Sequence, residues 1–218
     1  AGYRLSYPDE KLFMFYLDEF ETKLFDLPEG VYTCLIENED CEEQILTPGI
    51  DDEIFSRTKV PMTKNEVRVL SISRLELTKN AVVYDVGSGT GSVSIECARL
   101  SPDIFVFAIE QKEEAANLTK ENAVRFGLSD QIVVINKKAP EGFEELPTPT
   151  HVFIGGSSGA LSDILSAIQK KLIVKENTKG KTDKASKGVR VVINAVSLET
   201  IAQITNCLLY TSPSPRDR

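Results

Sequence analysis

A glycine-rich segment between two apolar stretches constrains the fold of this chain more than any other feature. Residues 81–100 read Ala-Val-Val-Tyr-Asp-Val-Gly-Ser-Gly-Thr-Gly-Ser-Val-Ser-Ile-Glu-Cys-Ala-Arg-Leu. The Val-rich start is typical of a buried strand, and residues 92–100 have a composition that favours a helix. The glycines between them allow a sharp turn and the close approach of a ligand, and the helix that follows presents free N–H groups. The segment predicts a strand, turn and helix that bind a nucleotide-type ligand.

A carboxylate follows the next apolar run. Residues 104–109 form this run, and it ends at Glu110. In doubly wound sheets a carboxylate at this position accepts hydrogen bonds from the ribose hydroxyls of an adenosine. The alternative is an ordinary solvated strand end. The Gly-x-Gly-x-Gly spacing, with Asp85 two residues ahead and Ser92 in place of a last glycine, favours S-adenosyl-L-methionine over a dinucleotide.

Composition and charge narrow the classes of function. The chain has 218 residues, of which 41% are apolar, which suffices for one good core. Its net charge of −8 argues against nucleic-acid binding. The first residues lack the features of a signal peptide and no apolar run has the length of a membrane span, so we expect a cytoplasmic protein with no membrane partner. The four cysteines show no paired spacing, and the single histidine is His151, so no metal site is expected.

Strand-like and helix-like segments alternate along the rest of the chain. Further strands are predicted at residues 131–136, 151–154 and 189–194, and helices at 63–77, 112–126, 160–171 and 198–206. Thr63 and Glu66 are spaced as a capping box for the first of these helices. Such regular alternation with short connections predicts right-handed crossovers and a mostly parallel sheet, an α/β fold.

A second glycine-rich turn, residues 155–159, follows the strand at 151–154. The carboxyl end of a central strand is where open α/β sheets bind ligands. Free N–H groups together with Ser157 and Ser158 predict an anion-receptive site. The alternative is a tight but inert turn. The turn lacks the Asp/Asn-Pro-Pro-aromatic motif of enzymes that methylate base amino groups, which argues against a DNA base as substrate.

The chain divides into four parts by composition. Residues 1–38 are too few to fold as a domain, and residues 39–58 form an acidic linker, with an acidic cation site as the alternative. Residues 59–206 form the α/β domain, in which the lysine-rich stretch 170–187 is expected to be a solvated loop or, alternatively, a collar for a polyanionic substrate. Residues 207–218 have no helical or strand period and resemble a non-native tail.

These motifs together resemble the decarboxylating precorrin-6B C15-methyltransferases of cobalamin (vitamin B12) biosynthesis. The resemblance covers about residues 60–206. The entry pattern Pro-x-Thr-x-x-Glu-Val-Arg and the Gly-Gly-Ser-x-Gly turn are the specific parts, whereas the first glycine loop is common to a superfamily. The matching segments are Val60-Pro-Met-Thr63, Glu66-Val-Arg68, Asp85-Val-Gly-Ser-Gly-Thr-Gly91, Ile109-Glu110, Ala139-Pro-Glu141, Ile154-Gly-Gly-Ser-Ser-Gly159 and Asn194-Ala-Val-Ser-Leu-Glu-Thr200.

The resemblance implies a class I S-adenosylmethionine-dependent methyltransferase with a Rossmann-like sheet. It implies methyl transfer to carbon 15 of a precorrin tetrapyrrole, with loss of the carbon-12 acetate carboxyl as carbon dioxide. No catalytic base can be named. The residues implied to hold the cofactor are Thr63, Gly87, Ser88, Gly89, Thr90, Gly91, Glu110 and Ala139, and those placed near the substrate are Gly155, Gly156, Ser157, Ser158 and Gly159.

The resemblance also implies features of the whole protein. Residues 5–10, Leu-Ser-Tyr-Pro-Asp-Glu, look like the tail of the companion methyltransferase that acts at carbon 5, so we expect a piece of a bifunctional fusion without carbon-5 activity. Family members continue past the fifth strand into an antiparallel pair that we expect to be missing here, which leaves an open sheet edge. The family further implies a homo-oligomer, a tetramer.

Three alternative functions stay open from the sequence. A methyltransferase of the same fold acting on RNA or protein would share the glycine loop and Glu110. A nicotinamide dehydrogenase would bind NADH in the same cradle. An inactive truncated fragment would bind neither cofactor.

Overall fold

The structure of the chain is a computed structural model that describes residues 2–3, 13–16, 19–23, 26–28, 33–34, 47–178 and 188–211. The chain separates into two compact units, residues 1–44 and 45–218. In the first unit, β1 (Gly2–Tyr3) pairs antiparallel with β2 (Thr33–Cys34), and α1 spans Phe20–Lys23. The sequence of this unit predicts a helix at residues 17–25 and a strand at residues 31–36, and within these ranges the structure describes residues 19–23 and 33–34. The motif at residues 5–10 lies outside the described residues.

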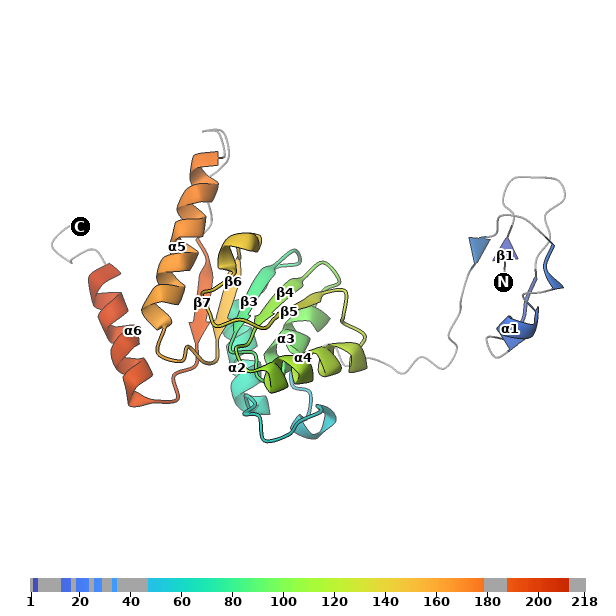
Figure 1. Ribbon diagram of the computed structural model, residues 1–218, viewed down its shortest axis with the longest axis horizontal. Helices are drawn as coiled ribbons and strands as arrows, with labels where there is room; N and C mark the ends of the chain where they lie inside the picture. The colour runs from blue at the N-terminus through green and yellow to red at the C-terminus, as the bar shows by residue number, and fades with distance from the viewer. Residues whose placement is uncertain are drawn as a thin grey trace. The chain divides into compact units, whose positions relative to one another are not determined.

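The second unit is built on a five-stranded parallel sheet (Figure 1). Its strands are β3 (Val82–Val86), β4 (Phe105–Ile109), β5 (Ile132–Ile135), β6 (His151–Ile154) and β7 (Arg190–Ile193), in the order β5-β4-β3-β6-β7. The strand order reverses between β3 and β6. The predicted α/β class and parallel sheet are confirmed, and this reversal is where doubly wound sheets bind ligands.

Helices cover both faces of the sheet. The helices are α2 (Asn65–Leu75), α3 (Ser92–Arg99), α4 (Glu113–Arg125), α5 (Leu161–Thr178) and α6 (Leu198–Thr211), with short 3-10 helices η3 (Asp52–Ile54) and η4 (Phe143–Glu145). One apolar cluster joins β3 and β4 to α2, α3 and α4 through residues such as Val83, Ile72 and Ile95. A second cluster, around Tyr84 and Ile164, joins the other face to α5 and α6. The alternation of side chains along β3 thus divides the core between the two faces. No helix among the described residues is long and apolar enough to span a membrane.

The predicted capping box at Thr63 and Glu66 is wrong. The N-cap of α2 is Lys64, and no side chain caps this end. The Thr63 carbonyl instead accepts a hydrogen bond of 2.7 Å from Nη1 of Arg68. Arg68 is fully buried and holds Thr63 outside the helix, so the first helical residue is Asn65.

The two C-terminal helices are longer than the sequence indicated. α5 continues to Thr178, so residues 170–178 of the expected lysine-rich loop are helical; residues 179–187 lie outside the description. α6 continues to Thr211, so the expectation that no helical period follows Asn206 is wrong for the residues up to 211. The added residues include lysine and leucine, which favour helix, so both helices continue beyond the ends, 171 and 206, that were predicted from sequence.

Part of the expected acidic linker packs on the domain. Phe55 is buried against Phe126, with 5.1 Å between the ring centroids. The amide groups of Gly49 and Ile50 donate hydrogen bonds of 2.9 and 2.8 Å to Oε1 of Glu96. The unit boundary accordingly lies between residues 44 and 45 and not at residue 58.

Candidate functional site

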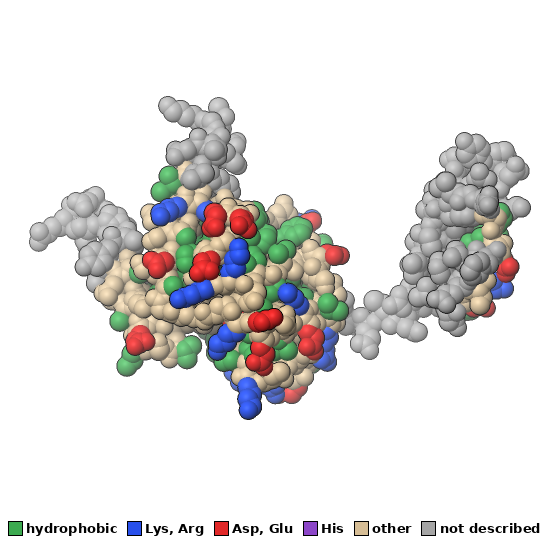
Figure 2. Space-filling view, viewed as in Figure 1, with side chains coloured by type: hydrophobic (Ala, Val, Ile, Leu, Met, Phe, Trp, Pro, Cys, Tyr) green, Lys and Arg blue, Asp and Glu red, His purple; other side chains and the backbone are tan. Residues whose placement is uncertain are grey.

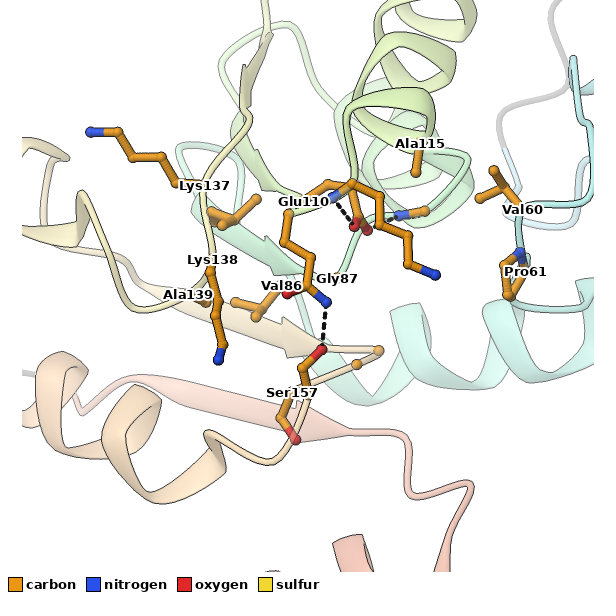
Figure 3. A pocket seen from close by; sticks show the side chains of 17 residues that line it. Val60, Pro61, Val86, Gly87, Glu110, Ala115, Lys137, Lys138, Ala139 and Ser157 are labelled. Carbon is orange, nitrogen blue, oxygen red and sulfur yellow. Dashed lines mark hydrogen bonds between the residues drawn. The ribbon is translucent and has the colours of Figure 1, made fainter.

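A pocket lies at the carboxyl ends of β3, β4 and β6, where the strand order reverses. Its volume is about 260 Å³, close to the lower end for ligand pockets. Figure 3 shows Val60 and Pro61 on one side, Ala139 on the other and Glu110 between them. The lining residues are Val60, Pro61, Val86, Gly87, Gly89, Ile109, Glu110, Gln111, Lys112, Ala115, Lys137, Lys138, Ala139, Gly155, Gly156, Ser157 and Ser158.

The first glycine turn is required by the packing of the pocket walls. Gly87 and Gly89 have φ values of 75° and 58°, a region that L side chains rarely adopt. A Cβ on Gly87 would lie 2.7 Å from the carbonyl oxygen of Gly156, and one on Gly89 would lie 2.8 Å from that of Pro61. Three segments distant in sequence therefore meet at this turn. Close approach of backbone to backbone accounts for both glycines, in addition to the predicted approach of a ligand.

Glu110 is fixed at the floor of the pocket. Its Oε2 accepts a hydrogen bond of 3.1 Å from the Gly89 amide, and its Oε1 accepts one of 2.9 Å from the Lys112 amide. The side chain of Asn136 holds the Glu110 carbonyl at 2.8 Å. The residue is 8% exposed and lines the pocket, so the carboxylate keeps acceptor capacity directed at a ligand (Figure 3). A solvated strand end does not describe this residue.

Asp85 supports the glycine turn from inside the protein. It is 1% exposed and does not line the pocket. Its Oδ2 accepts a hydrogen bond from the Ser94 hydroxyl, whereas Oδ1 has no hydrogen-bond partner among the described residues. Burial, with a contribution from the nearby Glu110 charge, raises the pKa of Asp85 to about 6, against the lowering effect of Ser94. Asp85, two residues ahead of Gly87, is thus a buried acidic residue that supports the glycine turn and does not face the pocket.

The second glycine turn forms the wall opposite Glu110. The Val86 carbonyl accepts hydrogen bonds from the amides of Gly155 (2.9 Å) and Gly156 (3.3 Å), so these two N–H groups are not free for an anion as expected. Ser158 has a φ of 48°, uncommon for a residue with a side chain. Its Oγ accepts a hydrogen bond of 2.7 Å from the side-chain amide of Gln111, which also lines the pocket. The turn is held in place by both β3 and the end of β4.

Some predicted site residues lie outside this pocket. Ser88 and Thr90 are buried behind the turn, and Ser88 Oγ lies 3.3 Å from Thr119 Oγ1. Gly91 faces Thr119, because a Cβ there would lie 2.7 Å from Cγ2 of Thr119. Thr63 faces the Arg68 network, and Gly159 does not line the pocket. The predicted residues that the structure brings together are Gly87, Gly89, Glu110, Ala139, Gly155, Gly156, Ser157 and Ser158.

The sequence reading missed several lining side chains. Gln111, Lys112 and Ala115 follow Glu110 and enter the pocket because α4 starts directly beside it. Lys137 and Lys138, in the loop that follows β5, also line the pocket. No spacing rule marks these side chains, since their positions depend on the directions in which loops leave β4 and β5.

A buried ion-pair network holds the wall formed by Val60 and Pro61. Arg68, fully buried, donates from Nε to Glu96 Oε1 at 3.1 Å and from Nη1 to Asp52 Oδ1 at 3.0 Å. Its Nη2 donates to the Ile50 carbonyl. Arg68 also lies over the Phe55 ring, 4.9 Å from its centroid. The specific entry motif therefore contains a structural arginine that fixes the chain leading into the pocket.

Comparison with known proteins agrees with this site. A sequence model described as "Precorrin methyltransferase domain" matches residues 53–211. The probable cobalt-precorrin-6B C(15)-methyltransferase (decarboxylating) of Pyrobaculum calidifontis is 40% identical over 164 residues, which are 74% of this chain and 77% of the relative. The protein of the same name from Saccharolobus solfataricus is 36% identical over 163 residues, 73% of this chain and 75% of the relative.

Solved structures agree in fold over the same region. Precorrin-6y C5,15-methyltransferase from Geobacter metallireducens superposes with a TM-score of 0.64 and 33% identity, covering 75% of this chain and 78% of that chain. Precorrin 8w decarboxylase of Methanobacterium thermoautotrophicum gives a TM-score of 0.63 and 34% identity, covering 74% and 80%. The matched residues contain the pocket, both glycine turns and Glu110. The chain therefore belongs to the precorrin methyltransferase family, with the decarboxylating cobalt-precorrin-6B C15-methyltransferases among its relatives.

Proposed function

We propose that this chain methylates carbon 15 of a cobalt-precorrin-6B-type tetrapyrrole in cobalamin biosynthesis, with decarboxylation of the carbon-12 acetate. S-adenosyl-L-methionine is the methyl donor. One observation carries the proposal: the segments that match the decarboxylating relatives meet at one pocket, where Glu110 is held by the Gly89 and Lys112 amides.

The residues of the pocket fit this cofactor. An adenosine ribose offers two neighbouring hydroxyl donors, and the Glu110 side chain offers acceptor oxygens with fixed orientation. The apolar side chains of Val60, Ile109 and Ala139 offer surface for an adenine ring. A carboxylate also suits the net positive charge of the donor.

The chain's own groups act by positioning. The cofactor, when bound, supplies a methyl group activated on a sulfonium sulfur, so no nucleophilic side chain is required. Glu110 fixes the sugar, and the turn from Gly155 to Ser158 forms the wall on which we place the tetrapyrrole. Holding two reactants in line lowers the barrier without further chemistry from the protein. The carbon–methyl bond forms as the sulfur–methyl bond breaks, which adds one positive charge to the ring. The acetate carboxylate leaves as carbon dioxide, and the electron pair that it leaves behind neutralises that charge.

Calorimetric titrations with S-adenosylhomocysteine and NADH test the cofactor assignment. Saturable binding of the first ligand and none of the second at low micromolar concentration is expected. The reverse result would identify a dehydrogenase. Methyl transfer to RNA or aspartyl peptides, with none to a tetrapyrrole, would identify a methyltransferase of another class.

The arrangement of the whole protein is a further part of the proposal. We place the chain in a bifunctional C5,15 protein, supported by the motif at residues 5–10 and by the likeness to a C5,15-methyltransferase. From the family resemblance we further propose that it assembles as a homotetramer. Sedimentation velocity of the purified chain measures the assembly state, and a monomer at all concentrations would contradict the tetramer.

A further inference from the structure

The pocket is basic although the chain is acidic. Three of its lining residues are lysines and one is a carboxylate, whereas the whole chain carries a net charge of −8. One of the lysines, Lys137, lies 3.8 Å from Glu145, so two lysines without such a partner among the described residues face one carboxylate. Figure 2 shows acidic and basic side chains interspersed on the face in view. A local excess of one sign inside a cleft raises the local concentration of ligands of the opposite sign.

The three lysines stand on two walls. Lys112 is the N-cap of α4, and Lys137 and Lys138 follow β5. Nζ of Lys137 lies 3.8 Å from Oε2 of Glu145. In Figure 3 the Lys137 side chain extends away from the pocket, whereas the Lys138 side chain extends towards the turn that carries Ser157. Within the described part of the chain, no ion pair is formed by Lys112 or Lys138. Both side chains are exposed, so their charges are available to a ligand.

The cofactor does not account for these charges. S-adenosylmethionine carries a net positive charge, so ammonium groups at its pocket oppose its binding. Glu110, the lone carboxylate of the lining, already accounts for the ribose contact. The cofactor has a single carboxylate, so two lysines at the pocket favour a further anionic partner. The second substrate of the proposed reaction, a tetrapyrrole with acetate and propionate side chains, has that chemistry.

We propose that Lys112 and Lys138 bind two separate carboxylate side chains of the tetrapyrrole and thereby determine which ring carbon faces the methyl group. The inference rests on the proposed function and adds the residues that orient the substrate. Contact at two points, one beside α4 and one after β5, fixes the rotation of the ring, which a single contact would leave free. The lysines thus serve as specificity-determining residues.

Steady-state kinetics with cobalt-precorrin-6B test the proposal. Each of Lys112→Gln and Lys138→Gln should raise KM about two- to fivefold, as for an ion pair in contact with solvent, and the double variant about 4- to 25-fold. Arginine at either position should restore most of the affinity. The affinity for S-adenosylhomocysteine should not fall, and added salt should raise KM less in the double variant than in the unsubstituted chain.

The matched control is the double variant Lys120→Gln/Lys170→Gln. It removes the same charge from two exposed helix positions outside the pocket. An unchanged KM in the pocket double variant, or an equal rise in the control, would overturn the inference. So would weaker S-adenosylhomocysteine binding in the pocket variants, because it would assign the lysines to the cofactor. No turnover by an unsubstituted chain that binds S-adenosylhomocysteine would instead refute the proposed substrate, and the inference with it.

Discussion

Replacing Glu110 probes the cofactor site at its best-defined contact. The carboxylate is 8% exposed and is held by two backbone amides, so its orientation is set before a ligand arrives. A hydrogen bond to a charged group contributes about 1.5–3 kcal/mol. Glu110→Ala should therefore weaken S-adenosylhomocysteine binding about 10- to 150-fold, if the net loss is one such bond.

Glu110→Gln separates charge from shape. The glutamine keeps the length of the side chain, but its NH₂ group must face one of two amide donors, Gly89 or Lys112, where the carboxylate had an acceptor. Exchange of a charged for a neutral acceptor should weaken binding about 5- to 10-fold, less than removal of the side chain. The matched control is Glu113→Ala, an exposed carboxylate three residues further on.

Calorimetric titration measures all three variants, and circular dichroism melting shows whether each is folded. The control should bind like the unsubstituted chain. A change of less than threefold in a folded Glu110→Ala variant would refute the ribose contact. An equal loss in the Glu113→Ala control would show that general charge, and not this contact, attracts the ligand.

Three predictions concern stability, measured as the free energy of unfolding in urea. Burial raises the pKa of Asp85 from 3.8 to about 6, so the folded chain binds this proton more tightly than the unfolded chain, and stability should fall by roughly 3 kcal/mol as the pH rises between these values. Asp85→Asn should abolish that fall, and a variant with the same pH profile as the unsubstituted chain would contradict the assignment to Asp85. Gly91→Ala should cost about 2–4 kcal/mol through backbone strain and a clash with Thr119, whereas Gly127→Ala should cost about 1 kcal/mol through backbone strain alone, since nothing lies within 4 Å of a Cβ there. Equal losses in the two variants would disprove the contribution of the clash. Arg68→Met should cost about 3–5 kcal/mol, because it removes the nearest cation from buried Glu96, whose other ion pair, with Arg99, spans 3.9 Å. Adding Glu96→Gln should restore part of the loss, whereas strictly additive losses would exclude the coupling.

The sheet could be predicted because its strands carry local signals. β3, β4 and β6 are short apolar runs bounded by glycine, a carboxylate or turn residues, and all were predicted within two residues of their ends. The end of α4 was also predicted, because Gly127, with a φ of 66°, follows its last turn. These features depend on residues adjacent in sequence.

The start of α2 could not be read from sequence. Thr63 and Glu66 have the spacing of a capping box, but Arg68 engages the Thr63 carbonyl while its other nitrogens reach Glu96 and Asp52. A tertiary network thus overrides a local cap.

The glycines of the first turn, Gly87 and Gly89, were predicted from the space that a ligand needs, and backbone packing also requires them. The sequence indicated space for a ligand, and the structure shows in addition that the carbonyls of Pro61 and Gly156 occupy the space a Cβ would need at Gly89 and Gly87. Lys112 and Lys138 were not identified as site residues, because nothing in a spacing pattern tells which exposed lysines face a pocket.

Product analysis after a single incubation measures methyl transfer and decarboxylation on the same tetrapyrrole. The purified chain is given cobalt-precorrin-6B and S-adenosylmethionine with a labelled methyl group, and the tetrapyrrole is analysed by mass spectrometry. We expect one product that has gained a single labelled methyl and lost a single carboxyl, with equal amounts of S-adenosylhomocysteine and carbon dioxide. A tetrapyrrole recovered without the label, or a labelled product that keeps all its carboxyls, would contradict it.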